Sequence, residues 1–259
     1  MFVFRTPRAP LSQRRGHRPA GGHLPGRPVL PPELAARARP VVSAAARLLP
    51  LPAPLVPLFG DGALRRGGTT VVAGPLGRGA TTLALSLLAA ASAEAGWAAA
   101  VGLTDPGVVA AAELGLDLRR VVFVPRPRGG WADAAAELLD GVDVVLVRPF
   151  GRARGAAARH LVARARERRS ALVVLAERPG DWPVGADVTL SVTAAEWCGV
   201  SKGHGHLLGR RAQVEATGRR SASRVRTRVL WLPTGSGVLA RWETGDEHDG
   251  GATASDTTT

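Results

Sequence analysis

Residues 69–82 read TTVVAGPLGRGATT, and this stretch decides what kind of fold the chain can adopt. Its first five residues, Thr69–Ala73, form a β-branched run that is typical of a buried strand. The nine residues after it follow the phosphate-binding loop of nucleoside triphosphatases, G-x-x-x-x-G-K-[ST], with Gly74, Gly79 and Thr81 at the required positions. The stretch therefore predicts a strand, a glycine-rich turn and a helix.

The loop lacks its charged residue, because Ala80 stands where the motif has lysine. In a working loop, backbone N–H groups surround the phosphates, the lysine reaches the β and γ phosphates, and the hydroxyl holds magnesium. Alanine cannot contact the γ phosphate, and Arg78 would bring its charge from the loop rather than from the helix start. We therefore expect a loop that keeps its shape and has lost its hydrolytic chemistry.

Composition fits one sizeable α/β domain with extensions, since 45% of the 259 residues are hydrophobic. No apolar run approaches the roughly 20 residues of a membrane span, and the basic N-terminus lacks the apolar region of a secretory signal. The one cysteine, Cys198, excludes an internal disulfide framework. We expect a cytoplasmic protein that does not enter a membrane.

The net charge of +13 lies on the flanks of the chain. Residues 1–50 carry a net charge of +8, residues 51–200 carry +2, residues 201–242 carry +8, and residues 243–259 carry −5. Basic flanks attract nucleic acid or an acidic partner.

Strands and helices alternate through the middle of the chain, and the order βαβαβαβαβ predicts a mainly parallel sheet with right-handed crossovers. The expected strands are Thr69–Ala73, Trp97–Leu103, Val121–Val124, Val142–Val147, Ala171–Leu175 and Val188–Val192. The expected helices are Ala80–Ala95, Val108–Leu114, Trp131–Asp140 and Arg154–Arg169. Two further strands, Leu207–Thr217 and Val225–Leu232, are expected to form an antiparallel edge.

Three regions follow from composition. Residues 1–57 are rich in Pro, Arg and Gly and are expected to be a largely disordered extension, with one short helix over Pro32–Leu49. Residues 58–243 form the α/β domain, and residues 244–259 form an acidic tail without a core.

Several stretches resemble the ATPase core of RecA-type recombinases. They are GALRRG (Gly62–Gly67) with the loop after it, TDPGVVAAAELGLDLRRVVFVPRP (Thr104–Pro127) and GVDVVLVRP (Gly141–Pro149). The resemblance covers about residues 58–235 and implies a three-layer RecA-like α/β fold. Within that superfamily the chain looks most like the ImuA group, in the actinobacterial form called ImuA-prime. The missing lysine, the short core and the segments WCGVSKGHGHLLGRRAQVEATGRR and RTRVLWLP carry this closer resemblance.

The resemblance implies a function in SOS-induced translesion DNA synthesis and mutagenesis. It implies a non-catalytic adaptor whose partners are an ImuB-like relative of Y-family polymerases and an error-prone C-family polymerase. Such an adaptor would work near DNA, in the nucleoid.

The resemblance also exposes two lost acids. Arg148 stands where the strand over Val142–Val147 should end in the acid that holds the magnesium shell, and a guanidinium cannot ligate a cation. Asp105 is the acid nearest to the place of the catalytic glutamate. We therefore expect neither ATP hydrolysis nor a bound ATP or magnesium cofactor. The degenerate nucleotide site comprises Gly74, Gly77, Arg78, Gly79, Ala80, Thr81, Thr82 and Arg148.

The C-terminal region supplies the expected DNA or partner contacts. Its candidates are a Gly-rich loop, an arginine cluster and one tryptophan: Lys202, His204, His206, Arg210, Arg211, Arg219, Arg220, Arg224, Arg226, Arg228 and Trp242. Two histidines without further ligands do not make a zinc site. Trp97 and Trp131 fall in core elements and are expected to pack there. Trp231 and Trp242 lie near the end of the domain, where either could anchor a partner, but core packing is the favoured interpretation for Trp231 and the role of Trp242 stays open.

Two other functions stay open from the sequence. One is a RecA-like DNA-dependent ATPase in which Arg78 replaces the lysine, and the other is a general nucleic-acid-binding protein that uses its basic flanks. Since residues 1–57 do not look like the element that links recombinase protomers, we expect no RecA-type filament.

Overall fold

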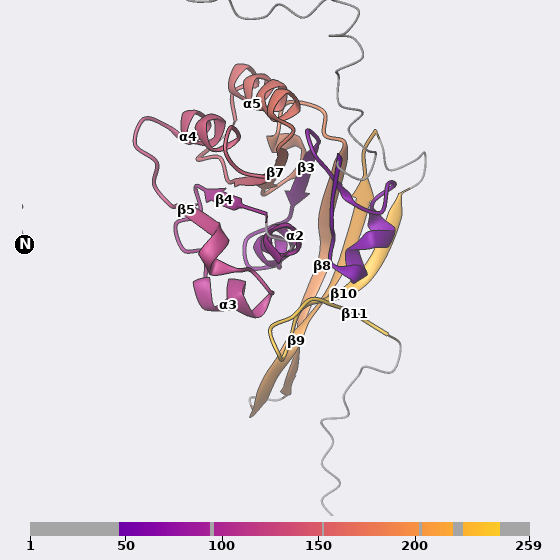
Figure 1. The fold of residues 1–259 in the computed structure, drawn as a ribbon. Coiled ribbons are helices and arrows are strands. Elements are labelled where there is room, and N and C mark those ends of the chain that lie inside the picture. The colour runs from indigo at the N-terminus through magenta and orange to yellow at the C-terminus, as the bar shows by residue number, and fades with distance from the viewer. Residues whose placement is uncertain (1–46, 94–95, 152, 202–203, 220–224, 244–259) are drawn as a thin grey trace, which may run out of the picture. The chain divides into compact units, whose positions relative to one another are not determined.

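The computed structural model describes residues 47–93, 96–151, 153–201, 204–219 and 225–243. Within them a nine-stranded sheet has the order β11-β10-β9-β8-β3-β7-β6-β4-β5 (Figure 1). Its strands are β3 (Thr69–Ala73), β4 (Ala98–Val101), β5 (Val121–Val124), β6 (Val144–Val147), β7 (Ala171–Ala176), β8 (Val188–Ser201), β9 (His204–Thr217), β10 (Arg226–Thr234) and β11 (Ala240–Arg241).

The first six of these strands in chain order, β3 to β8, pair in parallel. The strand that leads into the glycine loop, β3, lies between β7 and β8, and every one of its residues is buried. Strands covered on both faces read as continuous apolar runs, which is why the sequence pattern located them. The mainly parallel α/β sheet predicted from the sequence is confirmed.

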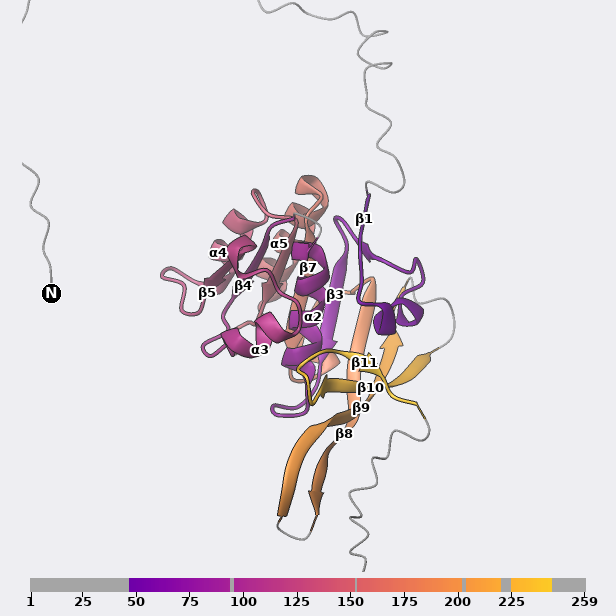
Figure 2. The same ribbon diagram turned by 60° about the horizontal axis from the view of Figure 1, so that its bottom comes forward.

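The remaining strands continue the sheet in antiparallel fashion, as the sequence predicted. They are longer than expected, because β8 and β9 have 14 residues each and run past their neighbours as a two-stranded ribbon (Figures 1 and 2). The predicted strand Val188–Val192 is only the buried beginning of β8. The rest of β8 lacks a clear apolar alternation, so sequence periodicity did not reveal it.

Helices cover the sheet on both sides and make three layers. One cluster of buried residues joins the sheet to α2 (Ala80–Ala93) and α3 (Val108–Glu113), and a second joins the opposite face to α4 (Trp131–Leu138) and α5 (Gly155–Arg168). The four helices occur where the sequence placed them, within two residues at each end. No helix among the described residues is both long and apolar enough to cross a membrane.

The ordered domain begins earlier than residue 58, where the sequence placed its boundary. β1 (Leu48–Leu49) pairs with β2 (Leu64–Arg65), and the 3₁₀ helix η2 (Ala53–Leu58) follows β1. Leu55 and Leu58 are completely buried, so these apolar residues contribute to the core despite the proline-rich composition around them. The end of the predicted helix Pro32–Leu49 is therefore a strand, and its part before residue 47, like residues 244–259, lies outside the described residues.

One tryptophan departs from its expected place. Trp97 is 46% exposed at the start of β4, whereas Trp131 is half-buried against the second core cluster. β4 begins at Ala98, one residue after Trp97. The Trp97 backbone N–H donates to the Asp143 carboxylate at 2.8 Å, and the Trp97 ring lies at the surface.

Candidate functional site

The glycine-rich loop joins β3 to α2 with the shape that the motif predicts. Gly77 and Gly79 have φ angles of 80° and 100°, a region that favours glycine. At Gly74 an added Cβ would lie 3.1 Å from Val192 and 3.2 Å from Ala80, so the backbone approaches its neighbours closely. Ala80 is buried at the start of α2, and Thr81 and Thr82 are half-buried in its first turn.

The space between this loop and the ends of β6 and β7 is small. The cavity there has a volume of about 20 Å³ and is bordered by the loop, Arg148 and Glu177. A cavity of this size holds about one water molecule. Arg148 and Glu177 also line a larger pocket next to this cavity.

Arg148 follows directly after β6, where the resemblance to RecA-type proteins implies an acid that holds magnesium. Its N–H donates to the carbonyl of Val101 at 2.9 Å, which fixes the backbone beside β4. The backbone at Gly102 lies very close to the Arg148 backbone, because a Cβ added at Gly102 would be 2.2 Å from the Arg148 carbonyl oxygen. Among the described residues no carboxylate lies within ion-pair distance of the Arg148 guanidinium.

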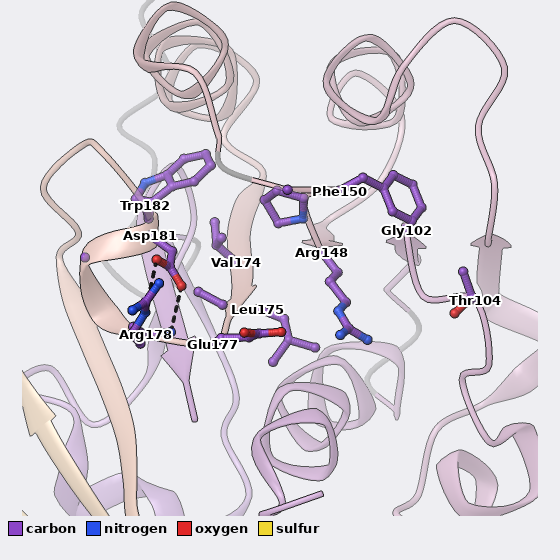
Figure 3. A pocket seen from close by; sticks show the side chains of 14 residues that line it. Gly102, Thr104, Arg148, Phe150, Val174, Leu175, Glu177, Arg178, Asp181 and Trp182 are labelled. Carbon is purple, nitrogen blue, oxygen red and sulfur yellow. Dashed lines mark hydrogen bonds and ion pairs between the residues drawn. The ribbon is translucent and has the colours of Figure 1, made fainter. Parts of the chain in front are cut away.

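A pocket of about 970 Å³ opens on the other side of Arg148, at the carboxyl ends of β4, β6 and β7. Ligands of open α/β sheets bind at this edge. In Figure 3 the side chains of Arg148 and Glu177 point into the same space from neighbouring strands. Thr104 also lines the pocket, whereas Asp105 is exposed and does not.

The far wall of this pocket is the short 3₁₀ helix η4 (Pro179–Asp181). Asp181 accepts a hydrogen bond from the Arg178 N–H at 2.9 Å and pairs with its guanidinium at 3.6 Å (Figure 3). Trp182 is 5% exposed, and its buried indole N–H has no hydrogen-bond partner among the described residues. The pocket thus combines apolar walls with two cations and two carboxylates, and sequence motifs did not reveal it, since its lining comes from three segments that are separate in the sequence.

Arg210 connects the loop with the C-terminal strands. Its guanidinium lies 4.2 Å from the centre of the Trp197 ring, and an added Cβ at Gly79 would be 2.9 Å from its Nη1. Burial lowers the pKa of Arg210, although an arginine remains protonated at physiological pH. Within the described parts of the chain, the buried Nε of Arg210 has no hydrogen-bond partner. The sequence placed Arg210 in a basic surface and the loop in another site, and the fold brings the two together.

The remaining arginines do not form one continuous surface, because side chains alternate across a strand. Arg226 and Arg228 lie on the face of β10 that carries Leu230, and Arg226 donates to the Pro57 carbonyl at 3.3 Å. Arg211 is on the opposite face of β9, where it pairs with Glu196 at 3.1 Å and covers the Trp242 ring at 4.9 Å. Arg219 donates to the Gly185 carbonyl at 3.2 Å.

The other predicted contacts are only partly described. Lys202, Arg220 and Arg224 lie outside the described residues, and of His204 only the backbone is described, as the first residue of β9. His206 is exposed. Within the described parts of the chain, no group of three or more His, Cys, Asp or Glu side chains is placed to hold a metal ion.

Comparison with known proteins gives two matches. The family model described as the MT3502 N-terminal domain matches residues 57–184, which contain the loop, Arg148 and the large pocket. The uncharacterized protein Rv3395c of Mycobacterium tuberculosis is 36% identical over 179 residues, which span 61% of this chain and 84% of that protein. The chain therefore belongs to the same protein family as Rv3395c.

Proposed function

We propose that this protein is a RecA-like accessory factor of SOS-induced translesion DNA synthesis, which acts as a non-catalytic adaptor. Its partner would be an ImuB-like relative of Y-family polymerases, with an error-prone C-family polymerase in the same assembly, in the cytoplasm close to DNA. The three layers and the glycine-rich loop after β3 support this proposal, because they fit the three-layer RecA-like α/β fold that the resemblance implied. The mycobacterial relative is consistent with the actinobacterial branch of that group.

The observation that carries the non-catalytic part is that Ala80 and Arg148, at the positions of the motif lysine and of the magnesium-holding acid, line the same cavity beside the loop. Phosphoryl transfer needs a lysine on the phosphates and an acid that holds magnesium, and both positions here have the wrong chemistry. A stable sheet that presents surfaces to other proteins needs none of these groups.

Affinity purification tests the adaptor function. The tagged full-length protein is isolated from DNA-damaged native cells in the presence of nuclease, and the bound proteins are identified by mass spectrometry. We expect translesion polymerase components to be recovered in damaged cells. Recovery of none of them from an extract that contains them would overturn the proposal.

Titration with nucleotide tests the competing ATPase. Calorimetry with ATP and ADP, with and without Mg²⁺, should detect no binding in the micromolar range. Micromolar affinity that disappears in Arg78→Ala would establish the atypical loop as a nucleotide site. Affinity for DNA that falls steeply with salt would instead favour a general nucleic-acid-binding protein.

A further inference from the structure

The side chain of Arg148 differs from every other half-buried arginine in the described parts of the chain. Seven others are half-buried, and each has a partner. Arg226 donates to the Pro57 carbonyl and Arg210 covers the Trp197 ring. The other five pair with carboxylates: Arg65, Arg66, Arg120, Arg164 and Arg211. The Arg148 guanidinium has no hydrogen bond, ion pair or ring contact with any described residue, although it is half-buried at the wall of the large pocket.

A free guanidinium in such a place costs stability. Partial burial removes water from the charged group, and no protein acceptor replaces that water. The backbone of Arg148 is held beside β4 by its bond to the Val101 carbonyl, so the side chain starts from a fixed point at the end of β6. An anion that enters the pocket would supply the missing acceptor.

The strand register brings a carboxylate to the same side of the sheet. β6 and β7 are parallel neighbours in which Val147 pairs with Val174, so Arg148 is level with Leu175. Since side chains alternate along a strand, Glu177 faces the same side as Leu175 and hence as Arg148. Figure 3 shows both side chains pointing into the pocket. The two groups are not within ion-pair distance of each other, and Glu177 has no other ion pair with a described residue.

The charges that line the pocket sum to zero. Arg178 and Asp181 pair with each other on the far wall, which leaves one free cation, Arg148, and one free anion, Glu177, among the described lining residues. A phosphate or a nucleic acid would gain one cation and be repelled by the carboxylate of Glu177. A ligand with one negative and one positive group matches both side chains.

The rest of the lining is apolar. Val174 and Leu175 come from β7, Trp182 closes the wall beyond η4, and Phe150 lies at the opposite side with 49% of its surface exposed (Figure 3). The volume of about 970 Å³ is that of a small-molecule site. An apolar group of the ligand would cover the exposed part of the Phe150 ring.

We propose that this pocket binds a small zwitterion with an apolar body, such as an apolar amino acid. Its carboxylate pairs with Arg148, its ammonium group faces Glu177, and its side chain packs against Phe150. This site goes beyond the adaptor function and does not depend on it, because every group that it uses belongs to this chain.

Three fluorinated probes separate these contacts. para-Fluoro-L-phenylalanine carries both charges, para-fluorophenylpropionate lacks the amine, and para-fluorophenylethylamine lacks the carboxylate. Fluorine NMR line broadening, titrated with the full-length protein, measures the affinity of each. We expect the zwitterion to bind most tightly, and the amine about tenfold or more weakly than the zwitterion, because it loses the charged hydrogen bonds to Arg148.

Variants assign each contact to its residue. Arg148→Gln should weaken binding of the two probes with a carboxylate about tenfold and should not weaken binding of the amine. Arg148→Lys keeps the charge and should restore part of the affinity. Glu177→Gln should reduce the affinity for the zwitterion to that for the propionate. Arg154→Gln, at an exposed arginine outside the pocket, is the matched control and should change none of the three.

The apolar contact has its own pair of variants. Phe150→Ala should weaken all three probes alike, whereas Trp97→Ala removes a ring that is 46% exposed outside the pocket and should have no effect. A urea midpoint of Arg148→Gln at or above that of wild type shows that this variant is folded.

Other outcomes contradict the site. Equal affinity for the three probes, unchanged carboxylate binding in Arg148→Gln, or no broadening at millimolar zwitterion would each overturn it. Displacement of the zwitterion by micromolar ATP would also overturn it, because the pocket would then take a polyanion. None of these results bears on the recovery of polymerase components in the affinity purification, so the two proposals fail separately.

Discussion

At the scale of single residues, the loop depends on glycine at positions where its motif and its packing coincide. Gly79 combines a φ of 100° with contact to Arg210 and Leu232, whose atoms would lie 2.9 and 3.5 Å from an added Cβ. The motif explains the glycine, but only the structure shows that an arginine from β9 occupies the adjacent space.

We expect Gly79→Ala to lower the free energy of unfolding by about 1–3 kcal/mol, because alanine is strained at this φ and its methyl group displaces the Arg210 side chain. Urea denaturation of the purified protein measures the change. Gly141→Ala is the matched control, since an added Cβ there meets no atom within 4 Å, and its effect should stay within about 0.5 kcal/mol. Equal stability of the two variants would contradict the close packing at Gly79.

At the scale of elements, η2 shows how tertiary contacts overrule composition. Its sequence, APLVPL, contains two prolines and lies in a segment that reads as disordered, yet Leu55 and Leu58 enter the core beside β10. Burial of these side chains offsets the cost of ordering the segment.

Leu55→Ala should therefore lower the free energy of unfolding by about 2–5 kcal/mol, the range for large-to-small changes in a core. The neighbouring Val56 is 38% exposed, so Val56→Ala should change it by no more than about 0.5 kcal/mol. Urea unfolding of both variants gives the comparison, and a harmless Leu55→Ala would mean that η2 does not belong to the folded domain.

The ion pairs between the end of α4 and helix α5 make a contribution to stability that depends on pH. Asp140 follows α4 and accepts a hydrogen bond from the Arg164 Nε at 2.7 Å, and it also pairs with Arg168 at 3.2 Å. The hydrogen bond with Arg164, aided by the charges of both arginines, lowers the pKa of Asp140 below its ordinary value. A lowered pKa in the folded state stabilises the fold above the unfolded pKa, and this stability is lost as the pH falls through the folded pKa.

We expect wild type to be more stable than Asp140→Asn at neutral pH, with the difference fading as the pH falls below about 4, the unperturbed range of aspartate. Urea midpoints between neutral and acidic pH measure this difference. Because the pair is exposed, added salt should reduce it. Glu137 of α4 forms no ion pair among the described residues, so Glu137→Gln serves as the control. A difference that grew on acidification would contradict the assigned pair.

At the scale of the whole molecule, the N-terminal part of the domain packs on its own sheet. η2 lies against β10 of the same chain, and Arg226 of β10 donates to the Pro57 carbonyl of η2. An element used within the chain is not available to link one protomer to the next.

We therefore expect no RecA-type filament when the protein is mixed with single-stranded DNA, with or without ATP. Negative-stain electron microscopy checks this, with a RecA recombinase on the same DNA as the positive control. Regular helical filaments of this protein would contradict the prediction.

The sequence by itself determined the order of strands and helices, because strands buried on both faces leave apolar runs that need no partner to be recognised. It also determined the chemistry of the loop and of Arg148, since the residue type at a motif position states what that position can bind.

Only the tertiary structure decided which residues of the C-terminal strands lie together. The register between β8 and β9 shifts between Val192 and Ala194, and the resulting bulge reverses the alternation along β8. As a result Trp197 pairs with Arg210, while Cys198 shares the opposite face with Arg211. A shift of one residue exchanges the two faces of a strand, and the sequence carries no periodic signal for it, because strand pairing and not local propensity fixes the register.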